Sequence, residues 1–192
     1  MTDTDSKLAG LNILLGVTGG VAAYKAVDLA SKLTATGAKV TSVLTRNARK
    51  LATTKSFEAV TGQQVFTRLF NTPSEYHIGH ISLAESADIV VVAPATANII
   101  AKIANGICDD LLSTILCACW DKPVLIAPAM NNQMWTNPAV RRNIETIKKM
   151  NFQFIGPETG RLACGTDAIG RMAEPADIVI ALQQIAEKIK KS

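Results

Sequence analysis

The sequence predicts an α/β fold in which helices cover a mainly parallel sheet. Short apolar runs alternate with segments of helical periodicity along the 192 residues, and this alternation is typical of β-α-β units. Aromatic residues make up only 5% of the chain, so Ala, Val, Ile and Leu must fill the interior, as they do in parallel sheets. The length suits one domain, which we expect to span residues 1–192 with a flexible start over 1–10.

The first elements form a β-α-β unit. Residues 12–18 (NILLGVT) are a continuous apolar run that predicts a buried strand. Residues 21–37 carry apolar side chains at helical spacing, and a second strand is expected over 39–44. A short helix is expected over 55–61, and residues 71–80 (NTPSEYHIGH) have the composition of a loop.

The same alternation continues through the second half of the chain. Strands are expected over 89–93, 122–128 and 153–155. Helices are expected over 98–119, 137–150 and 178–189. The first of these is broken near Gly106 and Asp109, and Asn137 is expected to cap the second. Residues 156–174 hold four glycines and are expected to form a loop.

The charge pattern argues against nucleic-acid binding. The net charge is +4, and one basic cluster, Lys188, Lys190 and Lys191, lies at the end of the last predicted helix. Lysines at this place complement the helix dipole. We interpret the cluster as a solvated helix end rather than as a nucleic-acid surface.

The cysteines do not predict a metal site. Cys108, Cys117, Cys119 and Cys164 form no CxxC pair, and only two histidines are present, so no metal is expected. The first three lie in a predicted helix and are interpreted as packing residues. The opening residues, MTDTDSKLAG, are polar, and no apolar run reaches about 18 residues. The simplest interpretation is a reduced, cytoplasmic protein.

Glycines and small polar residues follow four of the predicted strands at the point where each strand ends. The segments are TGG, LTRN, PATAN and PAMN, in chain order. Ligands of open parallel sheets bind at the carboxyl ends of the strands. We therefore expect a ligand site at this edge of the sheet.

The glycine turn after the first strand indicates the kind of ligand. Gly16, Gly19 and Gly20 let backbone N–H groups approach a phosphate at a helix N-terminus. The dinucleotide fingerprint GxGxxG is not matched, and the second strand ends in Thr45 and Arg46 rather than in an acidic residue. A mononucleotide with one phosphate fits better, although Arg46 leaves NADP open and the turn alone is compatible with no ligand.

Hydrogen-bonding side chains follow the next two strands. Thr96 and Asn98 lie in PATAN, and Asn131 ends PAMN. Each residue taken alone is an ordinary helix N-cap. Two such strand ends in one sheet favour a shared binding site.

Four blocks of the sequence resemble one family. They are GVTGGVAAYKA, HISLAESADIVVVAPATANIIAKIANGICDDLL, PAMNNQMW and RLACGTDAIGRMAEP. These blocks are similar to the motifs of the homo-oligomeric flavin-containing cysteine decarboxylases, above all to those that act on 4′-phosphopantothenoylcysteine in coenzyme A biosynthesis. The resemblance covers roughly residues 11–180. It implies a three-layer, Rossmann-like flavoprotein with FMN at the subunit interface of a trimer, sometimes assembled into a dodecamer.

The resemblance also implies roles for individual residues. The catalytic residues are His80 of the HISL block, Asn131 of PxMN and Cys164 of ACG. FMN contacts are implied for Gly19, Gly20, Val21, Thr45, Thr96, Ala97, Asn98 and Ala129. Substrate contacts are implied for Asn131, Met134, Arg161, Leu162 and Ala163. The second histidine, His77, lacks the HIxL context and is interpreted as a structural or surface residue.

The implied reaction uses flavin to make decarboxylation possible. A cysteine amide carboxylate does not simply lose CO2, because the carbanion left behind has no electron sink. Oxidation next to sulfur gives a thioaldehyde that accepts these electrons, and the resulting enethiolate is then reduced and protonated. In this scheme His80 manages protons, Asn131 holds the carboxylate without adding charge, and Cys164 gives the final proton.

Other assignments stay open on the sequence alone. Some relatives decarboxylate a C-terminal peptidyl cysteine, and others are non-catalytic subunits that bind a protein phosphatase. The PxMN and ACG blocks argue against a flavin prenyltransferase on the same scaffold. Thr166 and Ala168 stand where relatives often carry an acidic residue and a glycine, which bears on the mobility of the substrate flap. A phosphopantothenate–cysteine ligase is expected on the same chain or as a separate partner.

Overall fold

A six-stranded parallel sheet forms the centre of the molecule. The computed structural model describes residues 7–69 and 79–189. The strand order is β3-β2-β1-β4-β5-β6, and every neighbouring pair is parallel. The strands are β1 (Asn12–Val17), β2 (Lys39–Leu44), β3 (Val65–Phe66), β4 (Ile89–Ala95), β5 (Val124–Pro128) and β6 (Gln153–Phe154). This order confirms the predicted α/β fold class. Strands β2 and β3 are added on one side of β1, and β4, β5 and β6 are added on the other side.

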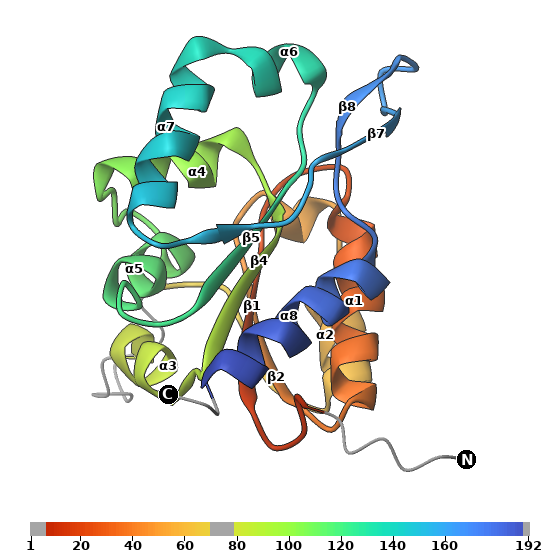
Figure 1. Cartoon of the computed structure of the whole chain (residues 1–192). Helices are drawn as coiled ribbons and strands as arrows, with labels where there is room; N and C mark the ends of the chain where they lie inside the picture. The colour runs from red at the N-terminus through yellow and green to blue at the C-terminus, as the bar shows by residue number, and fades with distance from the viewer. Residues whose placement is uncertain (1–6, 70–78, 190–192) are drawn as a thin grey trace.

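Helices cover both faces of the sheet, as Figure 1 shows. One face carries α1 (Ala23–Ala35), α2 (Thr54–Thr61) and α8 (Pro175–Ile189). The other carries α3 (Gly79–Ser86), α4 (Ala97–Asn105), α5 (Leu111–Ala118) and α7 (Pro138–Lys149). The molecule therefore has three layers, with the sheet in the middle.

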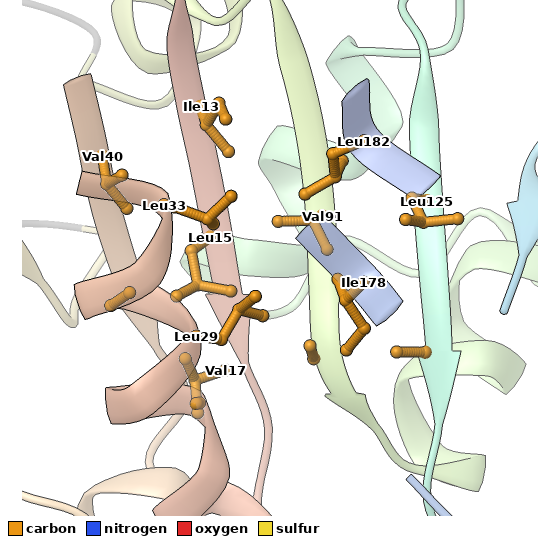
Figure 2. Packing of buried hydrophobic residues seen from close by; sticks show 14 of the residues in the cluster. Ile13, Leu15, Val17, Leu29, Leu33, Val40, Val91, Leu125, Ile178 and Leu182 are labelled. Carbon is orange, nitrogen blue, oxygen red and sulfur yellow. The ribbon is translucent and has the colours of Figure 1, made fainter. Parts of the chain in front are cut away.

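Alternate residues of β1 divide the core into two clusters. Ile13, Leu15 and Val17 point toward α1 and α8, where they pack in the cluster that contains Leu29 and Ile178 (Figure 2). Leu14 points to the opposite face and joins the cluster of α4, α5 and α7. A strand buried on both faces gives a continuous apolar run, which is why the sequence identified these strands.

Helix signals in the sequence mark several true boundaries. Gly106 ends α4 in the left-handed conformation. Asp110 begins α5, where its side chain accepts from the backbone N–H of Ser113. Asn137 begins α7, accepting from the N–H of Ala139, and Pro138 occupies the first turn. The predicted break inside 98–119 and the predicted cap at 137 are therefore confirmed.

The expected loop over 156–174 is wrong. The chain there forms an antiparallel hairpin of β7 (Glu158–Arg161) and β8 (Asp167–Arg171). Most of its residues remain exposed or partly exposed, so no apolar alternation marked the strands. The short helix α6 (Asn132–Thr136) and the two-residue strand β3 were likewise not expected. The last helix begins at Pro175, three residues before the expected start at 178.

The start of the described chain packs against the fold. Leu8 is fully buried, and the N–H of Gly10 donates to the carbonyl of Gly37. The expected flexible start therefore does not extend over these residues, and residues 1–6 of that prediction lie outside the described residues. Within 7–69 and 79–189, no helix has both the length and the apolar character needed to cross a membrane.

Candidate active site at the carboxyl edge of the sheet

A pocket of about 800 Å³ lies at the carboxyl ends of β1, β4 and β5. The hairpin β7–β8 and the start of α1 form its other walls. Most of the predicted site residues line it, namely Gly19, Gly20, Val21, Thr96, Ala129, Asn131, Met134, Arg161, Leu162, Ala163 and Cys164. The expected position of a ligand site, at this edge of the sheet, agrees with the pocket.

The two glycines of the first turn serve different purposes. A Cβ on Gly19 would lie 2.4 Å from the Cβ of Asn47, so the chain passes Asn47 only without a side chain. A Cβ on Gly20 would instead face the space between Thr96 and Ala129, 3.5 Å from the Thr96 Cγ2 atom. The first glycine is required by backbone packing, and the second keeps the pocket open beside the helix start.

Thr18 joins the ends of β1 and β4. Its hydroxyl donates to the carbonyl of Pro94 at 2.7 Å and accepts from the backbone N–H of Thr96 at 3.1 Å. The side chain is only 2% exposed. This buried hydroxyl therefore fixes the glycine turn relative to PATAN. Thr18 belongs to the TGG segment that was expected at this edge, but its role in joining the two strand ends was not predicted.

Asn131 and Cys164 meet across the pocket. The Oδ1 atom of Asn131 accepts from the backbone N–H of Gln133 at 2.8 Å and thereby caps α6. This bond orients the amide so that Nδ2 donates to the Sγ atom of Cys164 at 3.4 Å. Two residues that the sequence placed in separate motifs are thus in direct contact.

Neutral hydrogen-bond donors surround the Cys164 thiol. Its Sγ atom lies 2.8 Å from the Thr166 Oγ1 atom. The Thr166 hydroxyl, followed by the Thr166 backbone N–H, lowers the pKa of Cys164, and the Asn131 amide adds to the effect. The cause is that a thiolate accepts hydrogen bonds better than a thiol. By contrast, burial raises the pKa of Cys119 to about 11.

The hairpin is anchored to the end of β5. The N–H of Met130 donates to the carbonyl of Gly170 at 3.0 Å. Gly170 has a φ of 143°, and a Cβ there would lie 2.1 Å from the Met130 carbonyl oxygen. Only glycine permits this approach, which brings the β8 strand, and with it the Cys164 turn, beside PAMN.

Ion pairs form at one side of the pocket. Lys25 Nζ lies 2.7 Å from Glu174, and the Arg171 guanidinium lies 2.9 Å from Glu158. Lys25 also lowers the pKa of Glu174, because it stabilises the carboxylate. No ion pair forms at Arg161 within the described part of the chain. The lining residues Tyr24, Lys25, Arg171 and Met172 were not singled out from the sequence.

Some predicted site residues lie outside this pocket. Thr45 accepts from the N–H of Ala48 and shapes the turn after β2. Ala97 and Asn98 occupy the first turn of α4. His80 lies in the first turn of α3, a helix that packs against α5, and it is not among the residues that line the pocket. The prediction for His77 lies outside the described residues.

The packing role expected for three cysteines holds only for Cys119. Cys119 is fully buried. Cys108 and Cys117 are exposed, and Cys108 lies between α4 and α5 rather than within a helix. The expectation failed for two different reasons: Cys108 lies in the break between α4 and α5, and Cys117 lies on the exposed side of α5.

Comparison with known sequences assigns the chain to a family. The family model described as Flavoprotein matches residues 1–187. The coenzyme A biosynthesis bifunctional protein CoaBC of Bacillus subtilis is 46% identical over 177 residues, covering 92% of this chain and 42% of that protein. The CoaBC protein of Vibrio vulnificus is 44% identical, covering 92% of this chain and 44% of that protein. The chain thus spans less than half the length of these curated relatives.

Solved structures share the fold over nearly the whole chain. A cysteine-to-serine variant of a PPC decarboxylase, complexed with pantothenoylaminoethenethiol, is 34% identical with a TM-score of 0.82, covering 92% of this chain and 98% of that one. The FMN binding protein AtHal3 is 33% identical with a TM-score of 0.79, covering 93% and 97%. The FMN-dependent cysteine decarboxylase SpaF is 31% identical with a TM-score of 0.80, covering 94% and 99%. The family match over residues 1–187 and these relatives show that the chain belongs to the flavoprotein family.

Proposed function

We propose that this protein is an FMN-dependent enzyme that decarboxylates 4′-phosphopantothenoylcysteine to 4′-phosphopantetheine. One observation carries the proposal: the Asn131 amide and the Cys164 thiol lie 3.4 Å apart in a pocket that also contains the glycine turn. The names of the relatives support it, since they include coenzyme A biosynthesis proteins and FMN-dependent cysteine decarboxylases.

The residues at the start of α1 suit the phosphate of FMN. No side chain at Gly20 fills the space beside Thr96. Among the described residues, the backbone N–H groups of Val21 and Ala22 donate no hydrogen bond. The first turn of α1 contains no acidic residue, so nothing there repels an anion at the positive end of the helix. Thr96 offers a hydroxyl from the adjacent strand end.

The residues at the other side of the pocket suit the cysteine end of the substrate. FMN, when bound, supplies the oxidation and reduction at the carbon next to sulfur. Asn131 binds the carboxylate through its amide without a full charge, so the ground-state anion is not overstabilised against CO2 loss. Cys164 lies beside it with a proton to give. Met134 and the turn residues Leu162 and Ala163 line the same pocket.

We further propose that FMN binds where copies of this chain meet, in a trimer or in a dodecamer assembled from trimers. The side chains of Val21, Tyr24 and Met134 line the pocket and are 64%, 63% and 47% exposed. A second copy covering them would bury apolar surface and close the site. In this arrangement His80 reaches the reacting cysteine from the neighbouring copy, which accounts for its place on α3, outside its own chain's pocket.

A biosynthetic partner completes the proposal. A phosphopantothenate–cysteine ligase makes the substrate, either as a further domain or as a separate cytoplasmic enzyme. The bifunctional relatives, of which this chain covers 44% or less, support this association.

The deciding experiment is mass analysis of 4′-phosphopantothenoylcysteine after incubation with the purified, FMN-loaded protein. We expect loss of CO2 and formation of 4′-phosphopantetheine. Cys164→Ser should lose CO2 but accumulate the enethiol, which is lighter than the product by two hydrogens, and Cys117→Ser should match the wild type. Turnover of a peptide ending in cysteine, with none of the phosphorylated compound, would reassign the substrate. Protein that cannot be loaded with FMN would refute the cofactor.

A further inference from the structure

We propose that Thr166 is a positioning residue for proton donation by Cys164. Together with Asn131, its hydroxyl holds the sulfur over the pocket and stabilises the thiolate that remains once the proton has left. This inference rests on the proposed function, because it concerns the last proton transfer of that reaction.

The contact arises from the turn that joins β7 to β8. The backbone N–H of Leu162 donates a hydrogen bond to the Thr166 carbonyl at 2.8 Å, and the N–H of Gly165 donates to the Leu162 carbonyl at 2.9 Å. This closed turn brings the Thr166 Oγ1 atom to 2.8 Å from the Cys164 Sγ atom. Asn131, from a separate part of the fold, approaches the same sulfur at 3.4 Å. The sulfur is therefore held from two directions.

Charged groups do not supply this stabilisation. Arg161 and Asp167 are paired positions of the hairpin, and neither is among the groups that shift the pKa of Cys164. Helix α6, which packs against β8, contains no charged residue. Arg171 is paired with Glu158 and Glu174. The thiol thus meets neutral donors, and its pKa is lowered mainly by the Thr166 hydroxyl.

Neutral donors are the suitable environment for a thiol that must act as an acid. An adjacent cation strongly favours the thiolate and leaves no proton to give. An apolar environment raises the thiol pKa and weakens the acid. Hydrogen-bond donors without charge lie between these limits, because they bring the pKa toward the working pH while the thiol stays largely protonated.

The proton transfer is balanced. The S–H bond of Cys164 breaks, and a C–H bond forms at the substrate carbon that lost CO2. The sulfur keeps the electron pair as a thiolate, which accepts hydrogen bonds from the Thr166 hydroxyl and the Asn131 amide. Solvent returns a proton to the sulfur after the product leaves.

Thr166→Val tests the proposal because valine keeps the shape of threonine and removes the hydroxyl. The measurement is the rate at which iodoacetamide alkylates Cys164 in the FMN-loaded protein between pH 6 and pH 10 (chosen as the assay window around a thiol pKa of about 8.5). Peptide mass spectrometry separates Cys164 from the other cysteines. In Thr166→Val, we expect the midpoint of the alkylation rate against pH to move to higher pH. The alkylation rate near neutral pH should fall roughly threefold to tenfold, which corresponds to the net free energy of one hydrogen bond.

Two variants serve as controls. Thr166→Ser keeps the hydroxyl and should restore the alkylation profile. Thr159→Val makes the same change at an exposed position of the same hairpin, which does not line the pocket, and it should alter neither the profile nor turnover. With substrate, Thr166→Val should lower kcat and accumulate enethiol with KM little changed.

Identical alkylation profiles for the valine variant and the wild type would overturn the proposal. So would an equal loss in the serine and valine variants, because that result indicates a structural role for threonine itself. A third outcome separates the two proposals. If Thr166→Val shows the expected pH shift but the wild-type protein never releases CO2, the proposed function is refuted and the Thr166–Cys164 contact remains supported.

Discussion

At the scale of single residues, the polar groups of the site are held in place by other parts of the chain. Thr18 bonds to Pro94 and Thr96, and Asn131 bonds to the backbone of α6 before it reaches Cys164. Groups oriented in this way lose less freedom when a ligand binds, and this preorganisation favours both affinity and catalysis. Hydroxyls and amides carry this function without buried charge.

Thr18→Val should destabilise the fold and weaken FMN binding together. The change removes a buried hydroxyl and leaves the Thr96 N–H and the Pro94 carbonyl without this partner, which costs about 1–3 kcal/mol. Chemical denaturation and fluorescence titration with FMN measure the two effects. Thr18→Ser keeps the hydroxyl and is the matched control. Unchanged stability in the valine variant would show that the bridge does not hold these strand ends.

Residue roles could be predicted only where a motif carried them. Asn131 and Cys164 were found through resemblance, since no spacing rule joins side chains that are 33 residues apart. Lys25 was missed, although its position held a signal. It lies in the first turn of α1, where a cation opposes the helix dipole unless an acid neutralises it. Glu174 does so, but it is 149 residues away.

At the scale of elements, the hairpin β7–β8 is the least predictable and the most relevant to the site. Its strands are largely exposed, so they show neither the alternation nor the apolar run that identified the sheet. Its position depends on the close approach between Gly170 and Met130, to which the contact between Asn131 and Cys164 adds a second link. The strands of the central sheet, buried on both faces, were predictable for the opposite reason.

Gly170→Ala should detach the hairpin from PAMN. An added Cβ would clash with the Met130 carbonyl, and the φ of 143° is strained for any side chain. We expect a loss of about 1–3 kcal/mol and faster hydrogen exchange at the Met130 N–H. Gly62→Ala is the control, because Gly62 has a φ of 64° with open space around its Cβ position. It should lose stability without faster exchange at Met130. Slow exchange in the Gly170 variant would contradict the anchoring role.

At the scale of the whole molecule, the parallel sheet brings segments from both ends of the sequence to one edge. The strand order places β1 next to β4 in the middle of the sheet, and the pocket opens where these strands end. The sequence predicted the sheet and the edge at which the pocket lies, because both follow from buried runs and topology. It did not predict where α3 lies relative to the pocket, because helix packing depends on side-chain contacts far apart in the chain.

Mixing two inactive variants should restore part of the activity. If FMN binds between copies, a site with wild-type His80 from one chain and wild-type Cys164 from its neighbour forms in about a quarter of random contacts. Neither His80→Asn nor Cys164→Ser alone should make 4′-phosphopantetheine, and both should retain FMN. Mass analysis of the product after co-refolding measures the recovery. No recovery in verified mixed oligomers would place both residues in one chain's site.

Glu174 should contribute stability that depends on pH. Its pKa is lowered mainly by the hydrogen bond with Lys25, so the contribution is present above the ordinary carboxyl value and is lost as the pH falls through the lowered value. Glu174→Gln should cost a few tenths to about 1 kcal/mol at pH 7, since the carboxylate is partly exposed. Denaturation of both proteins should show this difference vanishing in acid. Glu145→Gln, at an exposed position of α7, is the control. A difference between Glu174→Gln and the wild type that does not depend on pH would contradict the assignment.

The anchoring of the hairpin also determines when the pocket comes into existence during protein synthesis. The glycine turn, PATAN and PAMN all leave the ribosome before residues 158–171, which form the hairpin. Until then the nascent chain presents strand ends with no cover and no Cys164. Flavin capture in the finished geometry therefore waits for residues that are made after the other walls of the pocket.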